Sequence, residues 1–138
     1  MTMNIVVIGG TRFIGRAIVE ELLWQGHRVT ICHRGRHEAR FSAPVAHVHG
    51  DRRDYPRFEA GLTYLSPETV VDIIPMNADD SQALVDALRG RIARSVHVSS
   101  GDVYAPGQPI PIPEDAPLNP AQPVELRLDD QTIPYSKV

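Results

Sequence analysis

A glycine-rich turn close to the N-terminus is the first part of the sequence that could carry chemistry. Residues 6–15 read VVIGGTRFIG, a run that breaks at Gly9 and Gly10 and resumes at Gly15. A turn of this kind between a strand and a helix gathers backbone N–H groups and the positive end of the helix dipole at one point, where a pyrophosphate can bind. Gly9 allows the tight turn, and Gly15 lets the helix pack closely on the sheet because it has no Cβ.

Arginines stand where a site would distinguish NADP from NAD. Arg12 occupies the middle position of the turn, which usually keeps a glycine so that the backbone can approach the phosphates. The second apolar run ends TICHRGR at residues 30–36, with His33, Arg34 and Arg36 where NAD-preferring sites place an acidic residue. Guanidinium groups form charge-assisted hydrogen bonds to phosphate, so these residues predict NADP in preference to NAD. The alternative is an ordinary turn with solvated arginines.

Five short apolar runs are predicted to be the strands that position this turn. They are rich in β-branched residues and mostly lack polar alternation, which is typical of strands buried on both faces of a parallel sheet. The runs are Ile5–Ile8, Val29–Cys32, Val45–His49, Val70–Ile74 and Val96–Val98.

The first helix is predicted directly after the glycine turn. A 3.6-residue period indicates a helix that starts at Thr11 as its N-cap and stops at Gly26. Its apolar face is predicted to consist of Ile14, Ala17, Ile18 and Leu22.

Two further helices separate the later strands. Residues 54–65 give a weaker helical pattern, because Pro56 and Gly61 interrupt it. The next helix carries Leu84, Ala87 and Leu88, begins at Asp79, Asp80 or Ser81, and ends at Gly90. Residues 34–44 are predicted to be a loop. This alternation predicts an α/β fold, a Rossmann-type doubly wound parallel sheet of about five strands followed by a proline-rich loop.

The character of the sequence changes after Tyr104, because eight of the twelve prolines lie between Pro106 and Pro134. No helical or strand period continues there, which leaves two interpretations: a disordered tail, or a long loop over a ligand crevice. We therefore divide the chain into a dinucleotide-binding domain, residues 1–104, and residues 105–138. The second part is predicted to hold a proline-rich active-site loop and the start of a truncated C-terminal half.

Composition narrows the class of protein. The chain has 138 residues, 42% of them hydrophobic, which suits one globular domain. A net charge of −3 argues against general attraction to nucleic acid or anionic lipid. A single cysteine excludes an internal disulfide and suits a reducing compartment. The apolar runs are strand-sized and no secretory signal is visible, so we expect no membrane span and a cytoplasmic location.

Several segments, in order, resemble one family. GGTRFIG at 9–15 resembles the turn of the extended and atypical short-chain dehydrogenase/reductases, the NAD(P)-dependent epimerase/dehydratase family, whose usual form is G-x-x-G-F-I-G. The form with a central arginine is similar to a subgroup that includes chloroplast stem-loop-binding proteins. Further matches are HGDRRD at 49–54, VVDIIPMN at 70–77 and HVSSGDVYAPGQPIPIPEDAPLNP at 97–120. The resemblance covers essentially the whole chain, which looks like the N-terminal part of a family member.

The resemblance implies a set of site residues. The cofactor, NADP or else NAD, would be held by Gly9, Gly10, Thr11, Arg12, Phe13, Ile14, Gly15, His33, Arg34, Asp51, Arg52 and Ser99. Ser100 matches the hydroxyl that binds the substrate oxygen, and Tyr135 matches the catalytic base. The family's lysine, four residues after the tyrosine, would fall one residue beyond Val138, and Lys137 does not match it. We interpret Asp102 as a solvated loop carboxylate.

The implied function is hydride transfer between nicotinamide and a hydroxyl-bearing substrate, with a nucleotide sugar as one candidate. Family enzymes are longer, with further strands and a substrate-binding region, so the fifth strand is expected to be an open edge. We therefore expect a homodimer or association with a missing C-terminal half. One alternative is a non-catalytic NADP-binding sensor. The other is RNA binding, which the negative charge and the lack of an aromatic and basic stripe disfavour.

Histidines are present, but their spacing predicts no metal site. His47 and His49 lie on one face of the third predicted strand, and no third ligand follows at a matching spacing. Cys32, inside the second strand, is interpreted as a small buried apolar residue.

Overall fold

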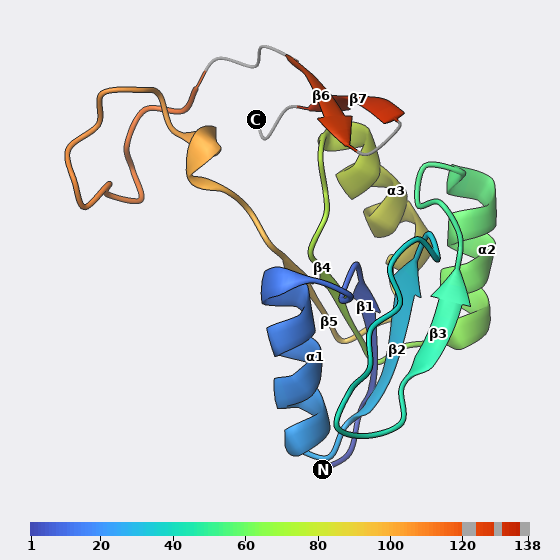
Figure 1. Cartoon of the computed structure of the whole chain (residues 1–138). Coiled ribbons are helices and arrows are strands. Elements are labelled where there is room, and N and C mark those ends of the chain that lie inside the picture. Colours follow the sequence, from blue (N-terminus) through green and yellow to red (C-terminus); the bar gives the residue numbers. More distant parts are fainter. Residues whose placement is uncertain (120–123, 129–130, 136–138) are drawn as a thin grey trace.

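The computed structural model describes residues 1–119, 124–128 and 131–135. Five parallel strands form one sheet in the order β3-β2-β1-β4-β5 (Figure 1). Their bounds are β1 Asn4–Ile8, β2 Arg28–His33, β3 Ala46–His49, β4 Thr69–Asp72 and β5 Arg94–His97. Each coincides with a predicted apolar run to within about two residues, which is the ordinary uncertainty of element ends. The parallel sheet is confirmed.

Helices cover both faces of the sheet (Figure 1). They are α1 Phe13–Trp24, α2 Tyr55–Leu65 and α3 Ala78–Leu88. β1 sends successive side chains to opposite faces, so Val6 and Ile8 join the core beneath α2 and α3. Ile5 and Val7 join the core beneath α1. This two-sided burial explains the unbroken apolar run and confirms the doubly wound, Rossmann-type fold.

The buried face of α1 differs from the predicted one. Gly15 and Val19 are buried, whereas Ile14 is 62% exposed. The reason is the glycine turn: a Cβ added to Gly15 would lie 2.9 Å from the Cα of Gly10, so this glycine must face inward. The helix is thereby rotated, and Ile18, Leu22 and Leu23 pack beside Val19.

The ends of the helices follow local chemistry. Arg12, not Thr11, is the N-cap of α1, and its side chain makes no capping hydrogen bond. The stop at Gly26 is confirmed, with φ +80°. Pro56 does not interrupt α2, because proline is tolerated in the first turn of a helix. α3 starts earlier than predicted, because the Asn77 side chain accepts a hydrogen bond from the Asp80 N–H at 2.9 Å.

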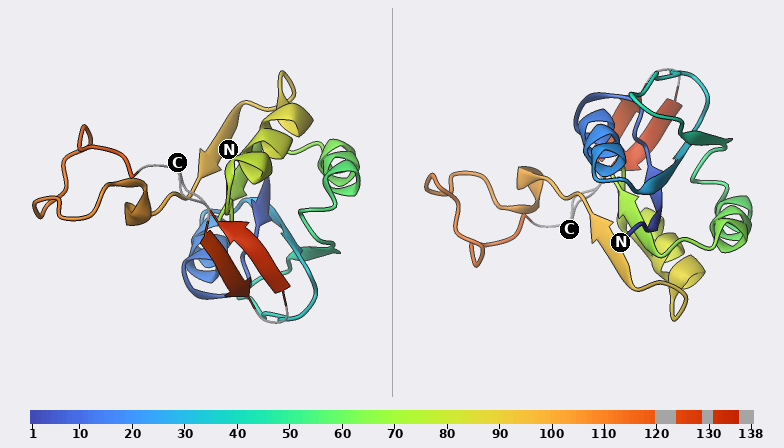
Figure 2. Two further views of the ribbon diagram at one scale, coloured as in Figure 1. Left: turned by 90° about the horizontal axis from the view of Figure 1, so that it is seen from above. Right: turned by 90° about the horizontal axis from the view of Figure 1, so that it is seen from below.

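The C-terminal segment forms a hairpin that the sequence did not predict. β6 (Val124–Leu128) and β7 (Gln131–Tyr135) pair antiparallel, and they lie above the carboxyl ends of the main strands (Figures 1 and 2). The prediction of no strand after Tyr104 was wrong. Pro134 lies within β7, and a proline argues against a central strand. It is tolerated here because both strands of a two-stranded ribbon are edge strands. Lys137 lies outside the described residues.

Along the chain, the proline-rich stretch follows β5 of the main sheet and precedes this hairpin. A single bridge pairs Tyr104 with Leu118, and the Ala105 N–H donates to the Pro117 carbonyl at 2.8 Å. The loop so closed extends away from the sheet (Figures 1 and 2). Within the described part of the chain, no helix is long and apolar enough to cross a membrane.

Candidate functional site

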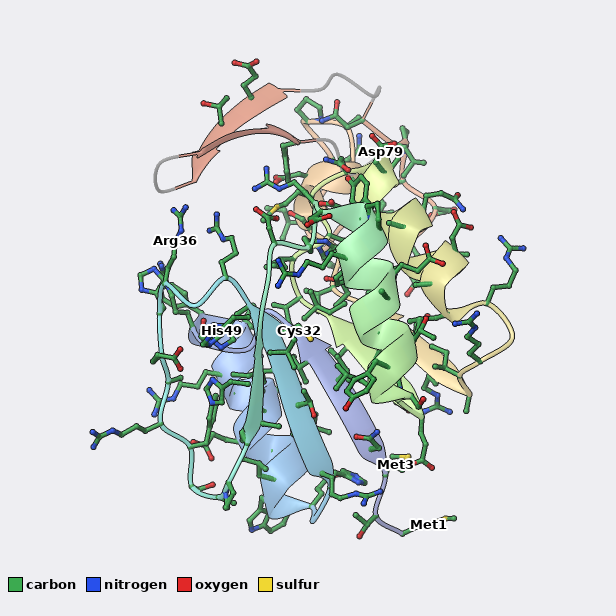
Figure 3. All side chains as sticks on the ribbon, turned by 90° about the vertical axis from the view of Figure 1, so that its right-hand side faces the viewer. Met1, Met3, Cys32, Arg36, His49 and Asp79 are labelled. Carbon is green, nitrogen blue, oxygen red and sulfur yellow. The ribbon has the colours of Figure 1, made fainter. Side chains whose placement is uncertain are left out.

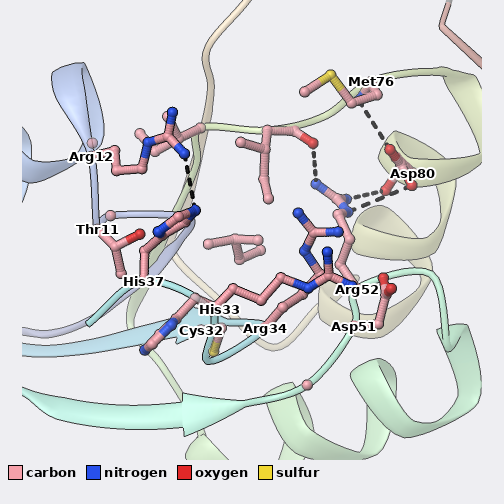
Figure 4. Close-up of a pocket in the computed structure, with 18 of the residues that line it drawn as sticks. Thr11, Arg12, Cys32, His33, Arg34, His37, Asp51, Arg52, Met76 and Asp80 are labelled. Atoms are coloured by element: carbon pink, nitrogen blue, oxygen red, sulfur yellow. Dashed lines mark hydrogen bonds and ion pairs between the residues drawn. The ribbon is translucent and has the colours of Figure 1, made fainter. Parts of the chain in front are cut away.

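A cavity of about 490 Å³ opens at the carboxyl ends of β1, β2 and β4 (Figure 4). β1 lies between β2 and β4, and the chain crosses to the opposite face of the sheet on either side of it. Open α/β sheets bind ligands at such a switch point. The cavity is lined by the glycine turn and by residues that follow β2, β3 and β4.

The glycine turn forms one wall. Gly9 and Gly10 adopt φ values of +99° and +88°, which glycine tolerates without strain. The Gly9 N–H donates to the Cys32 carbonyl at 2.9 Å and so fixes the turn to β2. All seven predicted turn residues line the cavity, namely Gly9, Gly10, Thr11, Arg12, Phe13, Ile14 and Gly15.

The first turn of α1 faces this cavity without a side-chain cap. An arginine at the N-cap position has no acceptor for the first amides of the helix. Phe13, the first residue of α1, has a φ of +45° and its side chain is 82% exposed. A non-glycine residue in this backbone region is strained, and such strain gathers at binding sites. The turn therefore places amides that the Arg12 side chain does not cap at the cavity wall, where an anion could bind.

Basic side chains line the wall that follows β2. His33, Arg34, Arg36 and His37 all face the cavity. Nη1 of Arg12 lies 3.0 Å from Nε2 of His37, so the turn and this segment meet across the opening (Figure 4). Figure 3 places Arg36 on the β2–β3 side of the molecule, with Cys32 toward the middle of the sheet. The arrangement sets several cations around one end of the cavity.

Arg52 lines the cavity, but its guanidinium group is already bound by buried residues of the protein. Its Nη1 donates to both carboxylate oxygens of Asp72, each at 2.7 Å, and Nη2 donates to the Asp80 carbonyl at 2.7 Å. Arg52 is 8% exposed, Asp80 1% and Asp72 0%. Contact of Arg52 with a cofactor stays a prediction. The two aspartates were missed, although a carboxylate inside the apolar run VVDII was a signal that a cation must lie opposite it.

Asp51, the predicted adenine ligand, also lines the cavity. Its Oδ1 accepts a hydrogen bond from the Arg53 N–H at 3.0 Å and lies 3.5 Å from the Arg53 side-chain Nε. The carboxylate is thereby oriented at the rim, next to the buried Arg52.

The predicted catalytic residues form a second group. Ser100 Oγ accepts from the Asp102 N–H at 3.2 Å, and the Tyr135 hydroxyl donates to Asp102 Oδ2 at 2.7 Å. The interpretation of Asp102 as a merely solvated carboxylate was wrong, because the hairpin carries Tyr135 onto it. Neither Ser100 nor Ser99 lines the cavity. Partial burial and then the hydrogen bond to Asp102 raise the pKa of Tyr135, while a hydrogen bond with Ser100 lowers it.

A family model for the NAD dependent epimerase/dehydratase family matches residues 5–125, most of the chain. The chain belongs to this family. The epimerase/dehydratase chain is 28% identical over 147 aligned residues to the chloroplast stem-loop binding protein of 41 kDa b from Arabidopsis thaliana. The match covers 97% of this chain and 39% of that protein.

Solved structures share the fold of this epimerase/dehydratase chain. The Bordetella bronchiseptica enzyme WbmG in complex with NAD and UDP superposes with a TM-score of 0.73 at 21% identity, over 87% of this chain and 44% of that one. UDP-glucose 4-epimerase from Brucella ovis in complex with NAD gives 0.72 at 23% identity, over 86% and 42%. The chain thus spans less than half the length of the relatives it matches.

Proposed function

We propose that this chain is the dinucleotide-binding part of an NAD(P)-dependent epimerase, dehydratase or reductase that acts on a hydroxyl-bearing substrate, such as a nucleotide sugar. The observation that carries the proposal is the uncapped first turn of α1, which opens into the cavity at the switch point of the sheet. Membership of the family and the NAD found in structural neighbours support a nicotinamide cofactor.

The residues present fit such a cofactor. Gly10 and Gly15 approach so closely that a Cβ on Gly15 would clash, so the turn packs directly against the start of α1. The amides of residues 12–15 would bind the pyrophosphate, and Asp51 would accept a hydrogen bond from the adenine. Arg34 and Arg12 would bind a ribose 2′-phosphate, so NADP is the proposed form. The chemistry that such a cofactor would supply is reversible hydride transfer with a substrate carbon.

Ser100 and Tyr135 are the proposed catalytic residues. The Ser100 hydroxyl would orient the substrate oxygen, and Tyr135 would exchange its proton. The raised pKa of Tyr135 means that, among the described residues, its neighbours keep the phenol protonated. A cation that stabilises the phenolate is therefore required for general-base work near neutral pH.

Further protein is proposed to complete the substrate pocket. All four residues of β5, the edge strand, are exposed. We propose that a C-terminal half or a second copy of this chain covers this edge and completes the substrate pocket, and that the protein works in the cytoplasm. Sedimentation of the chain alone and with such a half tests the association.

Titration of the chain with NADP⁺, NAD⁺ and a short RNA stem-loop tests the proposal. We expect saturable NADP⁺ binding that weakens roughly tenfold or more in Arg34→Glu, because hydrogen bonds to charged groups are worth about 1.5–3 kcal/mol. The control Arg89→Glu, an exposed side chain on the far end of α3, leaves the affinity unchanged. Absence of saturable dinucleotide binding contradicts the proposal.

The same protein sample can be used to distinguish two other candidate functions from the proposed one. The similarity to a stem-loop binding protein favours RNA binding as a second candidate, and binding of the stem-loop alone would establish it. A non-catalytic sensor binds NADP⁺ but turns over no substrate. Turnover that is lost in Tyr135→Phe would exclude the sensor.

A further inference from the structure

Four side chains that could bind a metal ion converge at the β2–β3 side of the sheet. His33 ends β2, Glu38 lies in the loop that follows, and His47 and His49 lie on β3. One ligand atom from each lies within 4.8 Å of every other. This group could not be predicted from the sequence, because Glu38 has no periodic relation to the histidines. His33 comes to lie opposite His49 through the parallel register of β2 and β3.

Three contacts in the group are close to the donor spacing of a metal site, and every pair of donor atoms lies within 4.8 Å. Glu38 Oε2 lies 3.1 Å from His47 Nδ1, and Glu38 Oε1 lies 2.9 Å from His49 Nε2. His33 Nε2 lies 3.0 Å from His47 Nδ1. In a tetrahedral zinc site with bonds of about 2.0–2.1 Å, neighbouring donors are about 3.3 Å apart. Small side-chain movements would therefore admit an ion among them.

We propose that His33, Glu38, His47 and His49 bind one divalent transition-metal ion, with Zn²⁺ as the ion that best suits imidazole and carboxylate donors in this number. Imidazole nitrogens favour zinc, copper, nickel and iron over the hard cations calcium and magnesium. The site adjoins the proposed dinucleotide site, and the two share His33.

Burial of the group is graded, which gives an ion shelter on one side and entry on the other. His33 is 8% exposed, and the side chains of His47, His49 and Glu38 are 24%, 55% and 58% exposed. The rings of His33 and His49 pack edge to face with centroids 4.7 Å apart. The two most exposed ligands can open to let the ion in, while the sheet holds the other two.

His33 is the weakest of the four ligands. Its Nδ1 accepts a hydrogen bond from the Gly35 N–H at 3.2 Å, so the neutral ring carries its proton on Nε2. To bind an ion through Nε2, the ring must move that proton and give up the Gly35 bond. Glu38, His47 and His49 are therefore the principal ligands, and His33 completes the set.

An ion in this position would act on the loop that follows β2. That loop, residues 34–45, connects two strands without a helix and carries Arg34 and Arg36 along the cavity. Binding Glu38 and two residues of β3 to one ion would fasten the loop to the sheet. The proposed role is structural, and it holds whichever ligand occupies the cavity.

The test uses the tag-free chain after treatment with a chelator. Calorimetric titration with ZnCl₂ is expected to give one equivalent bound, and Co²⁺ is expected to give the visible absorption bands of a tetrahedral site. His49→Ala and Glu38→Gln are expected to weaken Zn²⁺ binding by about tenfold or more, since even outer-shell partners of metal ligands are worth that much. Both side chains are exposed, so both variants should fold.

His97→Ala is the matched control, because His97 is an exposed strand histidine on the opposite edge of the sheet. Its Zn²⁺ affinity should equal that of the unsubstituted chain. The proposal is overturned if the chain binds no zinc saturably, or if His49→Ala and Glu38→Gln bind it as tightly as His97→Ala does. Circular dichroism of each metal-free variant separates loss of ligands from loss of fold.

Discussion

Nη1 of Arg12 lies 3.0 Å from Nε2 of His37, across the opening of the cavity. The arginine that stands in place of a glycine therefore leaves the turn intact: its side chain reaches outward to the segment after β2, and its backbone serves as the N-cap of α1. The turn keeps its uncapped amides and gains a cation at the same time. This favours a ligand with more negative charge than the pyrophosphate alone.

The first prediction concerns that cation. Arg12→Gly restores the usual turn and should bind NAD⁺ nearly as the parent chain does. It should lose roughly tenfold in affinity for NADP⁺, because a charge-assisted hydrogen bond is worth about 1.5 kcal/mol or more. Calorimetry with both dinucleotides measures the difference. Equal losses for the two would mean that Arg12 does not contact the 2′-phosphate.

The second prediction concerns the buried cation beneath the cavity. Arg52→Leu leaves Asp72 and Asp80 buried without their cation, so the free energy of unfolding should fall by about 3–5 kcal/mol. The adjacent Arg53→Leu is the control, since its ion pair with Asp51 is partly exposed and should be worth less than about 1 kcal/mol. Urea denaturation compares the two. Similar losses of unfolding free energy in the two variants would contradict a structural role for the buried ion pairs of Arg52.

The third prediction concerns the pH dependence of Tyr135. Partial burial and the Asp102 carboxylate raise the pKa of the phenol, so tyrosinate should form above the ordinary value of 10.0. Asp102→Asn removes the negative charge that opposes ionisation, so the pKa of Tyr135 should fall toward that value. Ultraviolet titration, with Tyr135→Phe subtracted to isolate this residue, measures the change. An unchanged or higher pKa in Asp102→Asn would be inconsistent with the contact.

The fourth prediction concerns the single cysteine. Cys32 is half-buried, not fully buried, and lines the cavity. Desolvation nevertheless raises the pKa of its thiol to about 12, so very little reactive thiolate exists at pH 8. Iodoacetamide should therefore modify the native chain far more slowly than the chain in urea. Mass spectrometry of timed samples gives both rates. Native modification at the rate of the unfolded chain would show that the folded surroundings do not suppress ionisation of the Cys32 thiol.

Features that depend on neighbouring residues could be predicted from the sequence. β1 and the turn are determined by the apolar run around Val6 and Val7 and by the glycines that follow it. Backbone preference and burial on both faces depend on the types of successive residues, so both can be recognised locally. The contacts of Tyr135 with Asp102, and of Glu38 with His47, join residues that are far apart or lie in loops. Nothing in their local pattern specifies which partner the folded chain brings near.

A crystal structure of this chain with NADP⁺ tests most directly whether the first turn of α1 binds the dinucleotide. We expect the pyrophosphate within hydrogen-bonding distance of the amides of residues 12–15, with the 2′-phosphate bound by Arg34. A dinucleotide bound away from the first turn of α1, or a cavity that stays empty at saturating NADP⁺, would contradict this expectation.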